Sequence, residues 1–263
     1  MKYILVTGAY GGMGRKTTEF LAEKGFTVFA LDKKTGEKQK NIIPIQADIT
    51  NEESIFHAVQ TVRAITDKLF AIVHFAGIYM LDSLGEMEIE SFEQIFRINV
   101  FGAFLINKAF LPFLEKGSRI LMTTSELAPL DPLPFTGIYA VTKSALDKYA
   151  YSLRMELQLL GIEVSVLRAG AVDTGMLGVS TRALEHFCEN TALYSCNAKR
   201  FKTIVDGVEA RNIAPEKIAE KAGKILGKKH TKFAYAINRN PLLLMLNALP
   251  KRTQLWVIKK ILE

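Results

Sequence analysis

Residues 2–14 have the sequence Lys-Tyr-Ile-Leu-Val-Thr-Gly-Ala-Tyr-Gly-Gly-Met-Gly, and this stretch decides the fold. The apolar, β-branched run over 2–7 predicts a buried strand, and the glycines after it predict a tight turn that opens a helix. Gly8 is expected to give the tight turn, and Gly12 to leave room for a pyrophosphate against the backbone. Gly14 is expected to allow close packing of the helix on the strand. Because the helix N-terminus then faces this loop, the stretch predicts a nucleotide site.

Outward from this stretch, apolar runs alternate with amphipathic stretches along most of the chain. Strands are expected at 2–7, 26–31, 42–46, 69–74, 118–124, 162–168 and 232–236. Helices are expected at about 12–24, 51–66, 88–115, 137–161 and 215–226, with a capping box of Thr50 and Glu53 before the second of them. Continuous apolar strands separated by helices indicate a parallel sheet covered on both faces. We therefore expect an α/β fold, a single doubly wound Rossmann-type domain over 1–239 with a seven-stranded, mainly parallel sheet.

The segment from about 175 to 212 has weak periodicity and is expected to be an irregular lid over the substrate region. Its apolar residues either line a pocket for a lipophilic molecule or only pack the lid, and the sequence leaves both interpretations open. These residues are Met176, Leu177, Leu184, Phe187, Leu193, Tyr194 and Phe201.

The composition is that of a globular chain, with 49% apolar and 23% charged residues in 263. The net charge of +7 is uneven, because residues 199–263 hold 15 Lys/Arg and 5 Asp/Glu, whereas residues 1–198 hold 19 and 22. The basic last quarter favours an anionic partner, such as a membrane surface or an acidic carrier, and argues against a nucleic-acid-binding protein. No signal peptide, membrane span, disulfide framework or metal-ligand spacing is recognised. A cytoplasmic protein without a bound metal is expected, with membrane association left open.

Asp32 ends the second expected strand, eighteen residues beyond Gly14. A carboxylate at this place accepts hydrogen bonds from the adenosine ribose hydroxyls and repels a 2′-phosphate, which favours NAD over NADP. The nearby cations Arg15, Lys33 and Lys34 either soften this preference or are solvated surface charges.

Ser125, Tyr139 and Lys143 have the spacing of a proton-transfer device. In a helix over 137–161 the i,i+4 offset places the lysine and the tyrosine on one face. A nearby ammonium stabilises a phenolate, so Lys143 is expected to lower the tyrosine pKa from its usual value of about 10. A tyrosine that titrates closer to neutrality exchanges a proton readily with a substrate hydroxyl.

Together these features resemble the short-chain dehydrogenase/reductase family, in its compact subclass, over nearly the whole chain. The loop Thr-Gly-x-x-x-Gly-x-Gly over 7–14 has the spacing of that subclass. The catalytic tetrad implied by the resemblance is Asn99, Ser125, Tyr139 and Lys143. The dinucleotide-binding residues that it implies are Gly8, Tyr10, Gly11, Gly12, Met13, Gly14, Asp32, Asp48, Ile49, Phe75, Ala76, Gly77, Tyr139, Lys143, Val172 and Thr174.

The resemblance implies hydride transfer between a nicotinamide cofactor and a secondary alcohol or ketone. Tyr139 is then the general acid/base, and Ser125 positions the substrate oxygen beside it. Lys143 would also bind the nicotinamide ribose, and Asn99 would hold a water that links Lys143 to solvent. The alternatives are a non-catalytic dinucleotide sensor or scaffold, and a 3-oxoacyl-carrier-protein reductase. A lipophilic substrate and a homodimer or homotetramer are expected, while substrate identity and physiological direction stay open.

The chain departs from the family pattern at two positions. His74 stands where the family usually has an asparagine that ties strands together, and it is expected to be a hydrogen-bonded core histidine. Ala169 stands where the family usually has a proline before Gly170, which removes backbone stiffness but no chemical group.

Residues 240–263 form an amphipathic basic tail on or beside the domain. Asn240 is expected to cap, and Pro241 to begin, a short helix that Pro250 ends. The apolar and basic residues that follow suit peripheral contact with an anionic membrane, and equally a subunit interface or a cover for the pocket.

Overall fold

The structure, a computed structural model, describes residues 2–209 and 211–263, apart from the side chains of 176–180 and 206–209. Its centre is a seven-stranded sheet in the order β3-β2-β1-β4-β5-β6-β7, and every pairing in it is parallel. The strands are β1 (Tyr3–Thr7), β2 (Thr27–Asp32), β3 (Ile42–Gln46), β4 (Ala71–His74), β5 (Arg119–Ser125), β6 (Glu163–Ala169) and β7 (Ala234–Ile237). The predicted doubly wound α/β fold and all seven predicted strands are confirmed.

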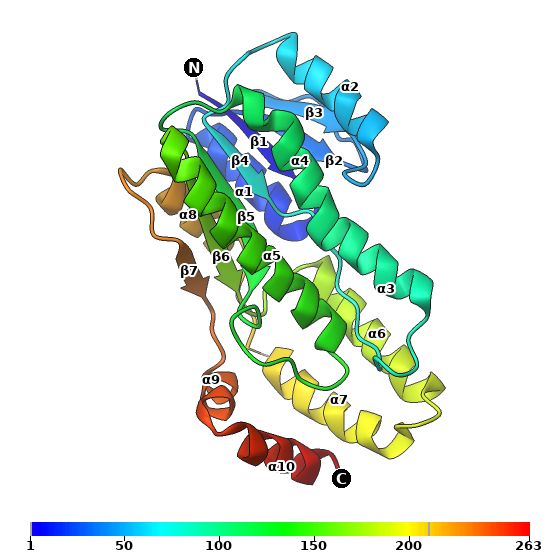
Figure 1. The fold of residues 1–263 in the computed structure, drawn as a ribbon. Helices are drawn as coiled ribbons and strands as arrows, with labels where there is room; N and C mark the ends of the chain where they lie inside the picture. The colour runs from blue at the N-terminus through cyan, green and yellow to red at the C-terminus, as the bar shows by residue number, and fades with distance from the viewer. Residues whose placement is uncertain (1, 210) are drawn as a thin grey trace.

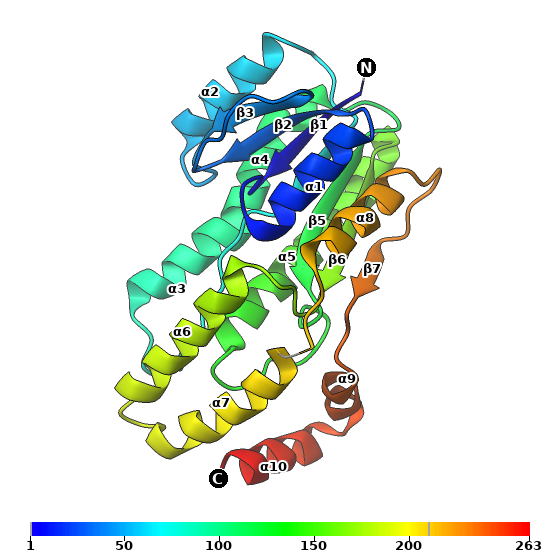
Figure 2. The ribbon, with the colours of Figure 1, turned by 180° about the vertical axis from the view of Figure 1, so that it is seen from behind.

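Helices cover both faces of the sheet (Figures 1 and 2). One face carries α2 (Glu52–Arg63), α4 (Gly102–Phe110) and α5 (Gly137–Leu157), and the other carries α1 (Gly12–Glu23) and α8 (Pro215–Leu226). Successive residues of a strand point to opposite faces of the sheet. Leu5 therefore packs against the α2, α4 and α5 side, and Ile4 and Val6 pack against the α1 and α8 side. Because both faces are buried, the strands are apolar throughout, which is the signal that made them recognisable.

The helix expected over 88–115 is present as one continuous helical stretch, Ile89–Phe113, whose form changes along its length. It consists of α3 (Ile89–Phe96), a π-helical turn η1 (Arg97–Phe101), α4 and the 3-10 turn η2 (Leu111–Phe113). The stretch Ile89–Phe113 is long and apolar enough to cross a membrane, but α4 packs against α2 and η1 against α5. We therefore interpret it as a helix of the domain core.

The capping box predicted for α2 is wrong. The helix is capped by Asn51, whose side chain accepts a hydrogen bond of 2.9 Å from the Ser54 backbone nitrogen. Thr50 instead donates its hydroxyl to Asp48 at 2.7 Å. Threonine and asparagine are both good N-cap residues. Because the Asp48 carboxylate takes the Thr50 hydroxyl, Asn51 is the residue that caps the helix.

The segment predicted to be an irregular lid is a helical hairpin, α6 (Gly175–Asn190) followed by α7 (Ser195–Glu209). Its apolar side chains form a small separate core, in which Leu184, Phe187 and Phe201 pack around Phe135. Tyr194 packs against the same Phe135 ring, with 5.2 Å between centroids, and Leu193 is exposed. The side chains of the remaining lid candidates Met176 and Leu177 lie outside the described residues. For the lid candidates whose side chains are described, packing within the hairpin is therefore favoured over lining a substrate pocket.

The tail forms two helices, α9 (Pro241–Ala248) and α10 (Lys251–Leu262). As predicted, Asn240 caps α9 by accepting a hydrogen bond of 2.9 Å from the Leu242 backbone. The backbone nitrogen of Asn240 donates to the buried Glu126 carboxylate at 2.6 Å, directly after β5. The tail therefore begins beside the strand that ends at Ser125, whereas its separation from 1–239 as a distinct unit stays a prediction.

Candidate active site

A cleft of about 1120 Å³ opens where β1, β2 and β4 end. It is bordered by the glycine loop, by the segment after β4, and by α3. Of the predicted dinucleotide-binding residues, those that line it are Gly8, Tyr10, Gly11, Gly12, Met13, Gly14, Asp32, Asp48, Ile49, Phe75, Ala76, Gly77 and Thr174. A cleft at the carboxyl edge of a parallel sheet, where the strand order reverses, is the usual ligand site of such folds.

Three glycines of the loop, Gly8, Gly12 and Gly14, have no room for a side chain. At Gly8, whose φ is +67°, an added Cβ would lie 2.5 Å from the Ala76 backbone nitrogen. At Gly14 it would lie 2.0 Å from the Gly8 carbonyl oxygen, and at Gly12 it would meet Thr174 at 2.6 Å. The backbone of the loop thus forms one wall of the cleft.

The first turn of α1 has no acidic residue, and its N-cap, Gly11, has no side chain to satisfy the helix amides. Those amides and the positive end of the helix dipole suit an anion. A bare backbone wall beside a helix N-terminus, in a cleft this large, fits a dinucleotide whose pyrophosphate lies against the loop.

Asp32 lies at the end of β2 and is joined to the glycine loop. One carboxylate oxygen accepts a hydrogen bond of 2.9 Å from the Tyr10 backbone nitrogen, and the other accepts one of 3.2 Å from Lys34. Each oxygen keeps a further lone pair for a ligand in the cleft. The carboxylate is therefore held in place, facing the region where a ribose would lie.

Asp48 follows β3 and is held in the same part of the cleft. It accepts hydrogen bonds from the Thr50 backbone and hydroxyl and pairs with Lys33 at 2.9 Å. Burial opposes ionisation, but the bonds from Thr50 and Lys33 prevail and lower the pKa of Asp48 to about 2. Ile49 beside it packs against the helix residue Gly102, where a Cβ would lie 2.5 Å away.

The turn after β4 is held by Asn99. Its amide oxygen accepts from the Ile78 nitrogen at 2.8 Å, and its amide nitrogen donates to the Ile78 carbonyl oxygen at 3.0 Å and the Thr142 hydroxyl at 3.2 Å. An added Cβ at Gly77 would lie 3.1 Å from this amide oxygen and 3.4 Å from the Lys143 ammonium. The π-helical turn η1 carries Asn99, and such turns often occur at functional sites.

Ser125, Tyr139 and Lys143 come together beside the cleft, next to its lining residues Gly77 and Tyr79. Tyr139 lies against Tyr79, with 4.8 Å between ring centroids, and Tyr79 lines the cleft. The Lys143 nitrogen is 5.6 Å from the Tyr139 ring centroid and donates to the Thr123 carbonyl oxygen at 3.3 Å. The three predicted residues therefore meet, and none of them belongs to the described lining of the cleft.

The predicted lowering of the Tyr139 pKa is wrong for the protein chain by itself. Burial raises this pKa, the neighbouring Tyr79 raises it further, and a hydrogen bond with Ser125 opposes the rise. Burial also lowers the pKa of Lys143 to about 8, since an ammonium loses hydration in the interior. At neutral pH the site thus combines a protonated tyrosine with a charged lysine.

Helix α5, which carries Tyr139 and Lys143, is fixed to the sheet by a buried ion pair. Arg168 of β6 donates two hydrogen bonds to Asp147 of α5, at 3.0 and 2.7 Å. Thr124 of β5 donates to the same carboxylate at 3.2 Å. A two-pronged contact of this kind sets the rotation of the helix, and with it the position of the tyrosine and lysine.

His74 is a hydrogen-bonded core histidine, as predicted. Its Nε2 lies 2.9 Å from the Asn107 amide oxygen of α4, and its Nδ1 lies 3.5 Å from the Thr7 hydroxyl of β1. Burial lowers its pKa to about 4. His74 thereby connects two strands and a helix, the structural task that the family usually gives to asparagine.

The two residues predicted at the far side of the cofactor site differ in position. Thr174, the residue before α6, touches Gly12 and lines the cleft. Val172 is buried, pairs through its backbone with Ile213, and does not belong to the described lining. The departure at Ala169 leaves the pairing of β6 with Ser125 and Ile237 intact.

Further residues line the cleft that no sequence motif indicated. They are Lys33, Lys34, Ala47, Thr50, Ile78, Tyr79, Gln94, Arg97, Ile98 and Gly175. Most of them directly follow or precede a predicted residue. Their position next to the end of a strand could therefore have indicated that they line the cleft. Gln94 comes from α3 and Arg97 from the start of η1, and only the fold brings this helical stretch to the cleft.

Comparison with known proteins gives a consistent result. The family model described as short chain dehydrogenase matches residues 2–185. Mouse estradiol 17-beta-dehydrogenase 2 is 34% identical over 208 residues, which are 72% of this chain and 55% of that protein. The chain therefore spans only about half the length of this relative.

Two other similar proteins are matched over most of their length. The 3-ketodihydrosphingosine reductase of Bacteroides thetaiotaomicron is 25% identical over 231 residues, covering 88% of this chain and 85% of that protein. The solved structure of a short chain dehydrogenase family protein from Francisella tularensis has a TM-score of 0.75 at 24% identity, covering 90% of this chain and 97% of that one. The structural likeness supports the fold described above.

Proposed function

The chain belongs to the short-chain dehydrogenase family, and from that premise we propose that it transfers a hydride between a nicotinamide dinucleotide and a secondary alcohol or ketone. The observation that carries the proposal is the meeting of Ser125, Tyr139 and Lys143 directly beside a cleft that has a glycine-rich wall. A sensor needs the cleft but has no use for a tyrosine and a buried lysine that meet beside it.

The protein residues would position the substrate and move its proton. The dinucleotide, when bound, supplies or accepts the hydride. Ser125 would donate a hydrogen bond to the substrate oxygen, and Tyr139 would exchange a proton with it. The raised pKa of Tyr139 keeps it protonated at neutral pH, which suits proton donation to a ketone.

Lys143 would stabilise the phenolate that Tyr139 leaves behind after donation. Its ammonium is close to Gly77, next to the predicted ribose position. Asn99 already uses its amide on Ile78 and Thr142, so its first task is to hold the turn after β4. A water held on its remaining lone pair is the proposed link from Lys143 to solvent.

We propose NAD as the preferred dinucleotide. The Asp32 carboxylate lies at the end of β2 and would accept from the ribose hydroxyls and repel a 2′-phosphate. Lys33, which could have bound that phosphate, is paired with Asp48 at 2.9 Å. Val172 and Thr174 are proposed to serve the nicotinamide end, where Thr174 touches the glycine loop.

A lipophilic substrate is proposed because the names of two relatives denote a steroid and a sphingoid base. The described apolar side chains of α6 and α7 support this only indirectly, because they pack against Phe135. Tyr79, which lines the cleft and touches Tyr139, is the described aromatic residue best placed to meet such a molecule.

We further propose that two copies associate through α4 and α5. These helices are adjacent, since Asn107 of α4 donates to the Tyr149 hydroxyl of α5 at 3.2 Å. Their outer faces expose Phe104, Tyr151 and Met155, each by 42% or more. Exposed apolar residues that gather on two neighbouring helices favour a subunit contact.

The function is tested by following the absorbance of reduced nicotinamide with a panel of secondary alcohols. The panel contains steroid alcohols, long-chain alcohols and short polar alcohols, each offered with NAD and with NADP. We expect turnover with NAD that is fastest on the steroid or long-chain members. Binding of NAD without turnover of any member would replace the enzyme by the sensor.

A further inference from the structure

The outer surface of the tail helices combines apolar and basic side chains. On α10, Arg252, Leu255, Trp256 and Lys259 follow the i, i+3, i+4, i+7 spacing of one helix face, and all four are exposed. Leu255 is 69% exposed and Trp256 is 61% exposed. On α9, Leu242 and Met245 are exposed three residues apart, and Leu249 is exposed directly after the helix ends. We call these seven residues the tail surface.

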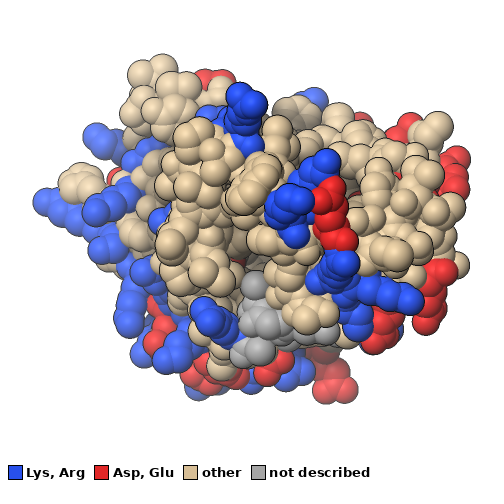
Figure 3. Space-filling view, turned by 90° about the horizontal axis from the view of Figure 1, so that it is seen from below, with Lys and Arg blue, Asp and Glu red and all other residues tan. Residues whose placement is uncertain are grey.

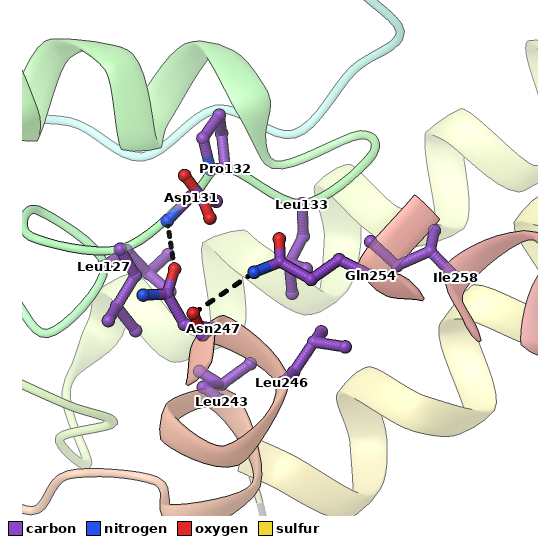
Figure 4. A pocket seen from close by; sticks show the side chains of 10 residues that line it. Leu127, Asp131, Pro132, Leu133, Leu243, Leu246, Asn247, Gln254 and Ile258 are labelled. Carbon is purple, nitrogen blue, oxygen red and sulfur yellow. Dashed lines mark hydrogen bonds between the residues drawn. The ribbon is translucent and has the colours of Figure 1, made fainter. Parts of the chain in front are cut away.

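The inner side of the tail is bonded to the protein, so the tail surface is held outward. The Asn247 side chain accepts from the Asp131 backbone at 2.8 Å, and Gln254 of α10 donates to the Asn247 carbonyl at 3.2 Å. These residues surround a pocket of only about 20 Å³, shown in Figure 4. At the C-terminal end of the tail, the Leu262 carbonyl oxygen accepts a hydrogen bond of 2.7 Å from the Asn197 side chain of α7.

The charges around the tail surface favour an anionic partner. Arg252 and Lys259 lie on the surface itself, and Lys199 and Arg200 are exposed on the neighbouring α7. Lys259 and Lys260 share the carboxylate of Glu263, and Lys251 pairs with Asp131. Figure 3 shows this end of the molecule, where broad uncharged areas are bordered by Lys and Arg.

We propose that the tail surface docks on an anionic phospholipid membrane. Tryptophan, aliphatic side chains and flanking Lys/Arg are the combination that binds at a bilayer interface. A second copy fits less well, because a face carrying Arg252 and Lys259 would meet the same cations across a two-fold contact. A soluble acidic protein would match the cations but leave Leu255 and Trp256 without an apolar partner.

The docked protein would present one end of the fold to the lipid. The tail begins beside Glu126, immediately after Ser125, and α7 lies next to α10 (Figures 1 and 2). The end of the molecule that holds α7 and the start of the tail beside Glu126 would therefore face the membrane. This orientation does not depend on the proposed reaction, and it can be tested without any turnover.

The test uses the full chain and vesicles of phosphatidylcholine, with or without phosphatidylserine. Trp256 is the single tryptophan of the chain, so its fluorescence reports on the tail surface alone. We expect a blue shift and co-sedimentation with the phosphatidylserine vesicles only, weakened by added salt. Leu255→Ser with Trp256→Ser should reduce vesicle binding about tenfold or more.

Charge removal separates the electrostatic contribution. Arg252→Gln with Lys259→Gln should weaken binding about fivefold for each charge at low salt. The matched control is Leu159→Ser with Leu160→Ser, which removes two exposed leucines at the far end of α5 and should leave binding unchanged. Circular dichroism of each variant checks that the fold is retained.

Two results would overturn the proposal. One is equal sedimentation of the wild type and the Leu255→Ser/Trp256→Ser variant with anionic vesicles. The other is no vesicle binding, together with a change of mass at sedimentation equilibrium in that variant, which would assign the tail surface to contact between copies.

Discussion

The nucleotide cleft is shaped by backbone atoms, whereas the end of the molecule formed by α6, α7 and α10 is shaped by side chains. Around Gly8, Gly12 and Gly14 even one added carbon collides with a neighbouring residue. At the other end Phe135 contacts the rings of Phe187 and Phe201, and at Gly175, the glycine described in these helices, an added Cβ would meet no atom within 4 Å. A backbone wall suits a ligand that is always the same, and a side-chain core can be rebuilt for different substrates.

The largest effect is expected at Gly14. Gly14→Ala places a Cβ 2.0 Å from the Gly8 carbonyl, so the loop must move, and we expect a loss of about 4 kcal/mol in unfolding free energy together with loss of NAD binding. The control is Gly25→Ala, where φ is +86° but no atom lies within 4 Å. Only the strain of the left-handed backbone, about 1 kcal/mol, is expected there. Similar denaturation midpoints for the two variants would show that the wall is not rigid.

A core truncation at the other end should separate the two regions. Phe135→Ala removes the ring at the centre of the α6–α7 core and should cost about 3 kcal/mol. We expect increased hydrogen exchange in α6 and α7, with NAD affinity within a few fold of the wild type. An equal loss of NAD affinity would mean that the two ends are one cooperative structure.

His74 tests how the strands of the nucleotide region are joined. Its folded pKa of about 4 lies below the unfolded value of 6.5, so the unfolded chain binds more protons between these values. The contribution of neutral His74 to the free energy of unfolding is therefore fully present above about pH 6.5. It is lost as the pH falls, by about 2 kcal/mol between pH 7 and pH 5. His74→Asn should remove this part of the pH dependence in urea titrations. An unchanged slope would mean that other groups cause it.

The smallest effect concerns cofactor choice. Asp32→Ala removes the acceptor at the end of β2 and should lower the preference for NAD over NADP about tenfold, or about 1.4 kcal/mol. The ratio of kcat/KM for the two dinucleotides measures it. A wild type that already prefers NADP would contradict the role given to Asp32.

The parts of the structure that the sequence predicted best are those under local constraint. The seven strands are apolar on both sides, and Gly8, Gly14 and Asp32 lie at fixed distances from strand ends. The helical hairpin was missed because its apolar residues serve a small core with Phe135, a partner forty or more residues earlier in the chain. The cap at Asn51 was missed because Asp48 takes the Thr50 hydroxyl.

The chemistry was harder to predict than the positions. Spacing alone indicated that Tyr139, Lys143 and Ser125 meet, but it carried no information on burial. Desolvation reverses the expected direction of the Tyr139 pKa, because both side chains lie in the interior. Gln94 and Arg97 could not be found at all, since only the path of α3 and η1 brings them to the cleft.

The central claim is that one region holds the dinucleotide and another moves the proton. Tyr139→Phe tests it most directly, because it removes the hydroxyl and leaves the glycine wall and Asp32 intact. NAD affinity from calorimetry and turnover from nicotinamide absorbance are measured on the same preparation. We expect affinity within a few fold of the wild type and turnover lowered about a thousandfold. Turnover close to that of the wild type would contradict the account.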